Sequence, residues 1–185
     1  MSRIDIPDRD DAPQASQPTL DGIFKKAGFI PNLFRLMSLS PAVLNAQHDL
    51  QSALAKALDL KTRVKIALAV SQVSDCAYCL AAHAYHAFNQ VKIDPKEIAL
   101  NRTGHSSEPK TDAALRFARK VTETRGHVSN SDLAEVRDAG YSDAQVLEIV
   151  AVSAAYLLTN FLNNVADTDI DVPDIEGSRP DSTVG

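Results

Sequence analysis

Two cysteines and a histidine stand close together near the middle of the chain, and their spacing has chemical content. Cys76 and Cys79 are the only cysteines in the sequence, and His83 follows Cys79 by four positions. At about 100° per residue, a helix would place the three side chains within about 60° of one another. Unpaired N–H groups at a helix start favour a thiolate, and an imidazole one turn away can accept or return the thiol proton. The segment predicts a redox-active dithiol with a histidine base.

Such a pair can also close a disulfide when its first cysteine lies at the frayed start of a helix. Peroxide oxidises one thiol to a sulfenic acid, and the second thiol then displaces water to give the disulfide. The main alternative is half of a metal site. With His83 the segment offers three ligands, and the sequence has no second Cys or Cys–His pair to supply a fourth. We therefore expect no metal, and inert core cysteines remain the other alternative.

Two neighbouring aromatic side chains are candidate supporting groups. Tyr78, between the cysteines, can lend a hydroxyl to the site, although packing is its more usual role. His86 lies one turn past His83 but is rotated away from the thiol face, so a surface or core histidine is favoured. The remaining three histidines stand without a partner motif, and no role is assigned to them (His48, His105 and His127).

Composition restricts the class of protein. The chain has 185 residues, 44% of them hydrophobic, which suits a single domain with a real core. Its net charge is −5 and its basic residues are dispersed, so no nucleic-acid partner is expected. No apolar run reaches the ~18 residues of a membrane span, and the N-terminus has no apolar signal region. Two adjacent cysteines suit a reducing compartment. We expect a soluble, cytoplasmic protein without a membrane partner.

Helix signals are dense between the two ends of the chain, and no segment alternates with period two. The fold class predicted is all-α, with one helical domain over residues 19–167. A flexible N-terminal arm is expected over residues 1–18 and an extended tail over 168–185. Ser74 or Asp75 can cap the helix that carries the cysteines. Further helices are expected from Ser40-Pro41 to about Leu58, at Asp94-Pro95-Lys96-Glu97, over Asp112–Arg125, from Ser129–Ser131 to Gly140, and after the capping box at Ser142.

Two of the expected helices are apolar nearly all round. They cover Val64–Val73, which leads into the cysteines, and Val146–Leu162. A helix without a polar face must be covered on several sides, and in a small domain a partner subunit is a natural source of cover. We therefore expect a homo-oligomer.

The same residues resemble a known family. The run Ala67-Leu68-Ala69-Val70-Ser71, followed by Cys76-Ala77-Tyr78-Cys79 and His83, is similar to the core motif of the alkyl hydroperoxidase D-like proteins. These belong to the carboxymuconolactone decarboxylase superfamily. The likeness runs from about Pro31 through Asp169, about three-quarters of the chain, and is greatest to the shorter peroxidase-related branch.

The resemblance implies an all-helical, homo-oligomeric fold and an antioxidant activity that reduces hydrogen peroxide or alkyl hydroperoxides. It implies no metal or organic cofactor, and a dithiol or lipoyl-type reductant. By resemblance Cys79 is the peroxidatic cysteine, Cys76 resolves it, and His83 accepts the proton. Local physics alone leaves the order of the cysteines open, although the placement of His83 one turn after Cys79 favours the same order.

One position departs from the family pattern. Members usually carry a glutamate twelve residues before the first cysteine, which completes a proton relay with the histidine. Here that residue is Val64. The departure favours a second hypothesis, a non-enzymatic redox-sensing or binding protein that turns over poorly. A decarboxylase-type enzyme acting on a small lactone is a third, weaker hypothesis, because that branch normally lacks the cysteine pair.

Overall fold

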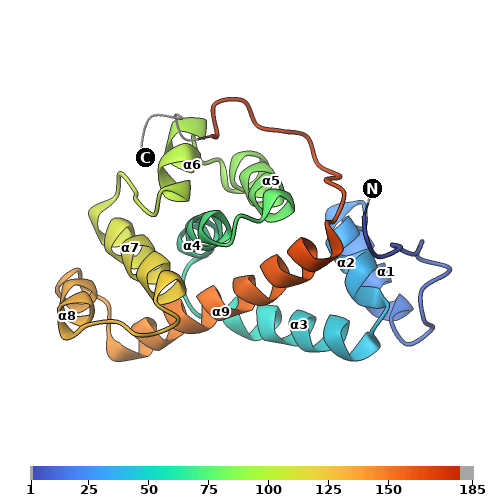
Figure 1. The fold of residues 1–185 in the computed structure, drawn as a ribbon, viewed down its shortest axis with the longest axis horizontal. Coiled ribbons are helices and arrows are strands. Elements are labelled where there is room, and N and C mark those ends of the chain that lie inside the picture. Colours follow the sequence, from blue (N-terminus) through green and yellow to red (C-terminus); the bar gives the residue numbers. More distant parts are fainter. Residues whose placement is uncertain (1, 180–185) are drawn as a thin grey trace.

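The computed structural model describes residues 2–179, which form nine α-helices and one π-helical turn and contain no strand (Figure 1). The all-α prediction is therefore confirmed. The helices are α1 (Gln17–Ala27), α2 (Asn32–Ser38), α3 (Pro41–Leu54), α4 (Leu60–Val73), α5 (Ala77–His86), α6 (Pro95–Arg102), α7 (Pro109–Glu123), α8 (Asn130–Asp138) and α9 (Asp143–Ala166), and the π-helical turn is η1 (Ala87–Val91).

Capping side chains start several helices where the sequence predicts them. The Ser40 hydroxyl accepts from the Val43 N–H, and Ser129 and Ser142 each form a reciprocal capping box. Gly140, with a φ of 90°, provides the left-handed residue between α8 and α9.

Other helix ends differ from the prediction. Helix α3 ends at Leu54 rather than near Leu58, and α9 continues beyond Leu162 to Ala166. The motif Asp94-Pro95-Lys96-Glu97 predicts a capping box at the start of α6, but Glu97 does not form one. Its carboxylate instead accepts a hydrogen bond from Lys65 at 2.8 Å, because that buried ammonium needs a counter-charge.

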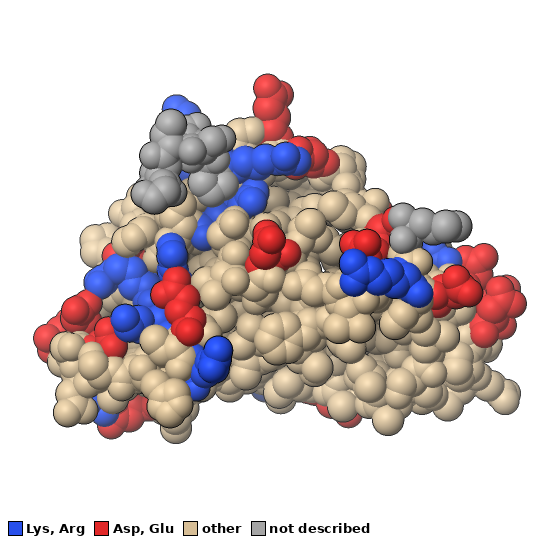
Figure 2. Space-filling view, in the orientation of Figure 1, with Lys and Arg blue, Asp and Glu red and all other residues tan. Residues whose placement is uncertain are grey.

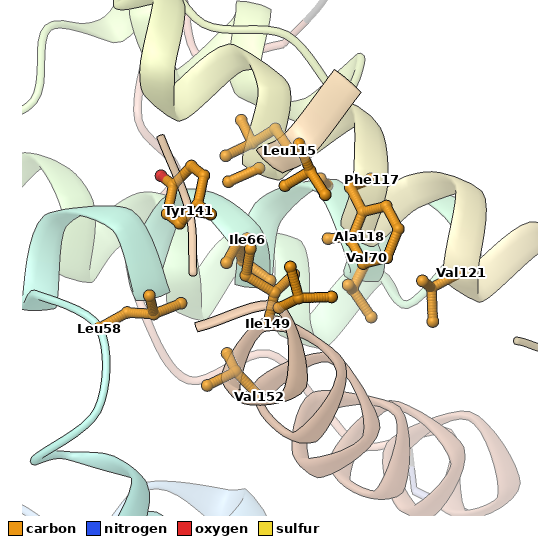
Figure 3. Close-up of a cluster of buried hydrophobic side chains, with 14 residues drawn as sticks. Leu58, Ile66, Val70, Leu115, Phe117, Ala118, Val121, Tyr141, Ile149 and Val152 are labelled. Carbon is orange, nitrogen blue, oxygen red and sulfur yellow. The ribbon is translucent and has the colours of Figure 1, made fainter. Parts of the chain in front are cut away.

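The main core lies where α4, α7 and α9 meet (Figure 3). Buried aliphatic and aromatic side chains from the three helices interlock there, among them Ile66, Leu115, Phe117 and Ile149. Helix α4 also packs against α5 and α6, and its residues from Val64 to Ser71 are all buried. The prediction of a helix without a polar face is therefore confirmed for α4.

Helix α9 is buried on one face only. By length and composition it is apolar enough to cross a membrane, but that face packs against α3, α4, α5 and α7 as a core helix does. Its opposite face exposes large apolar side chains, with Leu147 71%, Phe161 58% and Val165 65% exposed. The core therefore covers one face of α9 and leaves apolar side chains of the opposite face exposed.

Both terminal segments lie along the helices. The Ser2 N–H donates to Asp169 at 3.0 Å, and the Arg3 N–H donates to the Ala166 carbonyl at 2.6 Å. The chain after α9 passes α5 and reaches α6, where Arg102 donates to the Ser178 carbonyl (Figure 1). The predicted arm includes the first two residues of α1. Residue 1 of the arm and residues 180–185 of the tail lie outside the described residues.

Candidate active site

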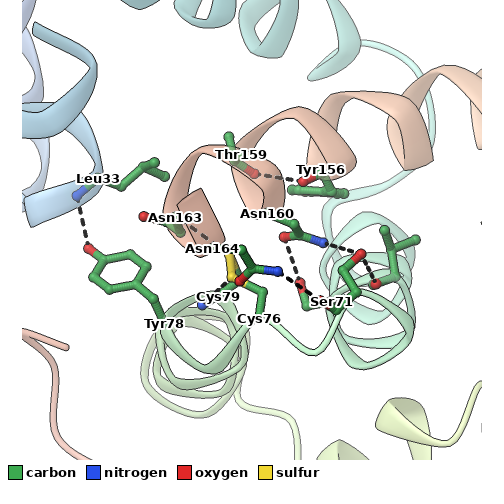
Figure 4. The surroundings of a disulfide bond; sticks show 12 residues. Leu33, Ser71, Cys76, Tyr78, Cys79, Tyr156, Thr159, Asn160, Asn163 and Asn164 are labelled. Atoms are coloured by element: carbon green, nitrogen blue, oxygen red, sulfur yellow. Dashed lines mark hydrogen bonds between the residues drawn. A yellow bond between two sulfur atoms is a disulfide. The ribbon is translucent and has the colours of Figure 1, made fainter. Parts of the chain in front are cut away.

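The two cysteines form a disulfide across the start of α5 (Figure 4). Their Cα atoms are 5.3 Å apart, and the Cys79 N–H donates to the Cys76 sulfur at 3.2 Å. The cap of this helix is Cys76 itself, not Ser74 or Asp75, because Asp75 turns the chain at a φ of 49° after α4 ends. The first cysteine is thereby held outside the helix, which lets its sulfur reach the third residue of α5.

The two sulfurs have different surroundings. Cys76 is wholly buried, whereas Cys79 borders a cavity of about 460 Å³. Side chains of α1, α2, α3, α4, α5 and α9 line this cavity, which we call the cysteine cavity. Cys79 is thus a lining residue of the cysteine cavity, whereas Cys76 is not.

His83 lies on the wall of the cysteine cavity, one turn of α5 beyond Cys79. The Tyr156 ring stands edge-on to the imidazole, with 5.1 Å between ring centroids. Burial, and then repulsion from His86, lowers the pKa of His83 to about 3. The imidazole is therefore neutral at neutral pH, the form that accepts a proton.

Val64 lines the same cavity as Cys79 and His83 and is 2% exposed. The position that carries glutamate in the resembling family therefore faces the candidate site. Among the described residues no carboxylate lines the cysteine cavity at all. His83 thus has no counter-charge on this wall to stabilise an imidazolium.

Sequence reasoning missed three asparagines of α9. The Asn163 side-chain amide donates to the Cys79 sulfur at 3.3 Å (Figure 4). Asn160 pairs with Ser71 and Ser74, and Asn164 donates to the Ser74 carbonyl, so α9 is fastened to the turn before Cys76. The signal was available, because these amides interrupt an apolar helix at i, i+3 and i+4 and must share a face.

The two candidate supporting groups have different positions. Tyr78 packs its ring against the cysteines, while its hydroxyl points toward Leu33 (Figure 4). That hydroxyl accepts from the Leu33 N–H at 3.2 Å and donates to Asp171 at 2.9 Å, so it joins α2 and the C-terminal segment to α5. His86 lies on the cavity wall beside His83, and His48 of α3, to which no role was assigned, lines it too.

The described part of the chain contains no group of three or more Cys, His, Asp or Glu side chains placed to hold a metal ion. With the sulfurs joined to each other, the site is a dithiol–disulfide couple with an adjacent neutral imidazole and a cavity. Such a centre can exchange two electrons with a small molecule or with another dithiol.

Comparison with known proteins agrees with this fold. The sequence model of the carboxymuconolactone decarboxylase family matches residues 41–124. A peroxidase-related protein from Ralstonia eutropha JMP134 with the alkylhydroperoxidase AhpD core is 25% identical, with a TM-score of 0.81 over 97% of each chain. A peroxidase-related protein from Silicibacter sp. TM1040 is 24% identical, with a TM-score of 0.79 over 97% of this chain and 95% of that one.

A third solved structure with the same fold is the debrominase Bmp8, which is 23% identical and has a TM-score of 0.74 over 92% of this chain and 91% of its own. No curated protein matches the sequence significantly. The fold is that of the alkylhydroperoxidase AhpD core. The family match over residues 41–124, together with this fold, supports an AhpD-like member of the carboxymuconolactone decarboxylase superfamily.

Proposed function

We propose that the protein is a thiol-dependent peroxidase that reduces organic hydroperoxides or hydrogen peroxide in antioxidant defence. The observation that carries the proposal is the position of Cys79. Its sulfur borders the cysteine cavity, is bonded to a buried Cys76, and lies one helical turn from the neutral imidazole of His83. Nucleophile, resolving thiol and base are thus present around one substrate-sized space.

In the first half-reaction His83 accepts the proton of the Cys79 thiol. The thiolate attacks the terminal oxygen of the hydroperoxide and the O–O bond breaks, which leaves Cys79 as a sulfenic acid. The departing alkoxide takes the proton from His83 and leaves as an alcohol. The Asn163 amide, which donates to the Cys79 sulfur, would stabilise the thiolate.

In the second half-reaction the Cys76 thiol attacks the Cys79 sulfur. The disulfide forms, and the hydroxide that leaves takes the Cys76 proton and becomes water. The hydroperoxide has then gained two electrons and the dithiol has lost two. An external dithiol of the lipoyl type would reduce the disulfide and be oxidised in turn. A cytoplasmic location is part of this proposal, because a reducing compartment can regenerate the dithiol.

A second candidate function is that of a redox-responsive protein with little turnover. The observation that favours it is Val64, which leaves the cysteine cavity without a carboxylate. A base with a pKa of about 3, lowered by burial and by His86, removes the thiol proton only weakly. This protein would still form the disulfide once per oxidation.

The test distinguishes a single oxidation of the two thiols from repeated catalytic turnover. Reduced protein receives one equivalent of cumene hydroperoxide and its thiols are counted. Consumption of excess hydroperoxide with dihydrolipoamide is then followed for the wild type and Cys79→Ser. A peroxidase loses both thiols, turns over, and loses activity in the variant. One oxidation without turnover supports the second candidate, and thiols untouched by peroxide contradict both.

A parallel arm uses 2,3,4-tribromopyrrole, which is bound in a solved complex of a cysteine-to-alanine variant of the debrominase Bmp8. Release of bromide with no consumption of hydroperoxide would favour dehalogenation over peroxide reduction as the reaction of this dithiol.

We also propose that the protein is a homo-oligomer, with α9 at the interface. The exposed face of α9 repeats apolar side chains at alternating spacings of four and three, as the seam of a coiled coil does. Figure 2 shows a broad area without charged side chains over the region of α3 and α9. The residues of this stripe, called the α9 seam below, are Leu147, Ala151, Ala154, Leu158, Phe161 and Val165.

A further inference from the structure

The charge of the cysteine cavity has one sign. The titratable side chains on its wall, tyrosines and Cys79 aside, are all basic: Lys26, His48, Arg63, His83 and His86. The remaining lining is largely apolar and carries no carboxylate from the described residues. In a protein with a net charge of −5, a cavity that gathers basic groups alone is not explained by composition. A reaction with neutral hydrogen peroxide or a neutral alkyl hydroperoxide does not require it.

Arg63 is a permanent charge on the cavity wall that acts on His86. In the described part of the chain no carboxylate pairs with it, and its one hydrogen bond goes to the Leu58 carbonyl at 3.0 Å. Burial, and then repulsion from Arg63, lowers the pKa of His86. Burial raises the pKa of Tyr156, and the Arg63 charge partly opposes that rise. The guanidinium therefore acts on the cavity wall and lacks the anion that would satisfy it.

Arg63 and the disulfide act on residues at different levels of α9. Tyr156 and Asn163 lie on one face of α9, two turns apart, which at 1.5 Å per residue is about 10 Å. Asn163 contacts the Cys79 sulfur, and Tyr156 lies in the field of Arg63. A ligand that reaches both would carry its reactive group and its charge at opposite ends.

Two buried amide oxygens of the cavity also lack partners. Asn163 Oδ1 and Gln47 Oε1 accept no hydrogen bond within the described residues, and both side chains are 2% exposed. Both residues line the cysteine cavity. Buried acceptors are normally satisfied, so these oxygens favour a ligand that brings a donor such as the O–H of a hydroperoxide.

From this arrangement we propose that the cysteine cavity takes an amphipathic organic anion, a hydroperoxide with an apolar body and a carboxylate that binds Arg63. The hydroperoxide part rests on the proposed function, whereas the anion site does not. A guanidinium presents two parallel donors to a carboxylate, and the apolar walls suit the body between the two polar ends. Lys26, exposed at the rim and without a carboxylate partner among the described residues, adds attraction at the entrance.

The first test uses an unreactive pair of probes, so that it does not depend on peroxidase activity. Calorimetry of the wild-type protein compares 4-isopropylbenzoate with its neutral amide, 4-isopropylbenzamide. We expect the carboxylate to bind about tenfold more tightly, with the difference shrinking as salt is added. Equal affinities, or tighter binding of the amide, would overturn the proposal without any variant.

Variants then test whether Arg63 is the residue that binds the carboxylate. Arg63→Gln should abolish the preference for the carboxylate, and Arg63→Lys should keep part of it. Lys25→Gln is the matched control, because it removes a cation from α1 at a residue that does not line the cavity. Circular dichroism checks the fold of each. If Arg63→Gln folds and keeps the full preference, Arg63 is not the anion partner and the proposal is wrong.

A kinetic arm separates the inference from the proposed function. Reduced protein is mixed with cumene hydroperoxide or its para-carboxylate derivative, and the rate of thiol loss is measured. Faster reaction of the carboxylate, lost in Arg63→Gln, supports both proposals. Preferential binding of 4-isopropylbenzoate with no reaction toward either hydroperoxide supports the anion site and overturns the peroxidase.

Discussion

His83 works in surroundings that favour its neutral form. The wall of the cysteine cavity offers it an aromatic edge from Tyr156, the valine side chain of Val64 and a second imidazole from His86. None of these groups stabilises positive charge as a carboxylate would. Proton transfer from Cys79 is therefore the step of the proposed mechanism that this sequence supports least.

Replacing Val64 with glutamate should improve that step. The new carboxylate would stand on the cavity wall with His83, near the positive charge of Arg63, which favours its ionised form. We expect alkylation of Cys79 to begin at lower pH and the reaction with peroxide to accelerate. General acid–base assistance is commonly worth about 10²–10⁴-fold, and a partial restoration should give less. Stopped-flow kinetics and the pH profile of alkylation measure both effects.

Val64→Gln controls for shape and polarity without charge. If Val64→Glu folds but matches Val64→Gln in its rate of reaction with peroxide and in its pH profile of alkylation, the carboxylate does not act on His83. A group on another helix would then handle the proton.

A neutral His83 also makes stability depend on pH. Its pKa falls from the ordinary 6.5 to about 3 in the folded protein because of burial and then His86. Between these values the unfolded chain binds the proton and the folded chain does not, so stability is complete above about pH 6.5 and declines as the pH falls. The contribution lost near pH 5 is up to about 2 kcal/mol.

Denaturation at neutral pH and near pH 5 tests this for His83→Gln, which should lose less stability on acidification than the wild type. Burial opposes the ionisation of Glu97, but hydrogen bonds from Lys65 and Ser106 lower its pKa to about 2. The stability that this carboxylate contributes is therefore lost only below about pH 4.5. The exposed His127→Gln is the control. A wild type and His83→Gln with the same pH dependence would refute the assignment.

Much of the candidate site could be predicted from local spacing, and the rest could not. Cys76, Cys79 and His83 lie within eight residues, where helix geometry alone relates them. Asn163 and Arg63 join the same cavity only through the packing of α9 and α4 around α5. No local pattern carries that information. The prediction that Ser74 or Asp75 caps α5 was wrong for a related reason, since Asp75 adopts a left-handed conformation that is uncommon for residues other than glycine.

At the scale of elements, α4 supports the site through one buried ion network. Lys65 is 1% exposed, and its ammonium contacts Glu97 at 2.8 Å and Glu108 at 3.1 Å. This ties α4 to α6 and to the start of α7, on the side away from the cysteine cavity. The sequence showed an apolar helix with one lysine, and only the tertiary structure shows why a lysine is tolerated there.

Glu97→Gln should therefore destabilise the fold. Lys65 would keep Glu108 but lose its shorter carboxylate contact, and a buried charge with incomplete compensation is costly. We expect a loss of about 2–4 kcal/mol in the free energy of unfolding, measured by urea denaturation. The exposed pair of Arg119 and Glu123 gives the control, because Glu123→Gln should change stability by about 0.5 kcal/mol or less. Equal losses in the free energy of unfolding for Glu97→Gln and Glu123→Gln would show that the buried network stabilises the fold no more than an exposed ion pair.

Some helix boundaries are set by neighbouring residues in the sequence, and others are set by tertiary contacts. The starts of α3, α8 and α9 follow from serine caps that act within four residues. The end of α9 does not, because the helix continues through Asn163 and Asn164, whose partners lie in and beside α5. Tertiary hydrogen bonds thus extend a helix past the end of its apolar pattern.

At the scale of the whole molecule, the α9 seam is an apolar surface that the packing of the single chain leaves exposed. A substitution there can test the proposed oligomer without disturbing the core, because Phe161 is 58% exposed in the single chain. Phe161→Glu should shift the mass in light scattering from a multiple of 20.0 kDa toward the single-chain value. Leu100→Glu on α6, also exposed, should leave the assembly intact. A wild-type protein of about 20 kDa at micromolar concentration would exclude the oligomer.

The central claim is that Cys79 is the residue that attacks peroxide, and trapping its sulfenic acid tests that claim most directly. Cys76→Ser and Cys79→Ser are reduced, treated with one equivalent of hydroperoxide in the presence of dimedone, and mapped by peptide mass spectrometry. The structure places Cys79 at the cavity and buries Cys76, so we predict dimedone on Cys79 in the first variant and little or none on Cys76 in the second. Labelling of Cys76 at a comparable rate, or of neither cysteine, would contradict the account.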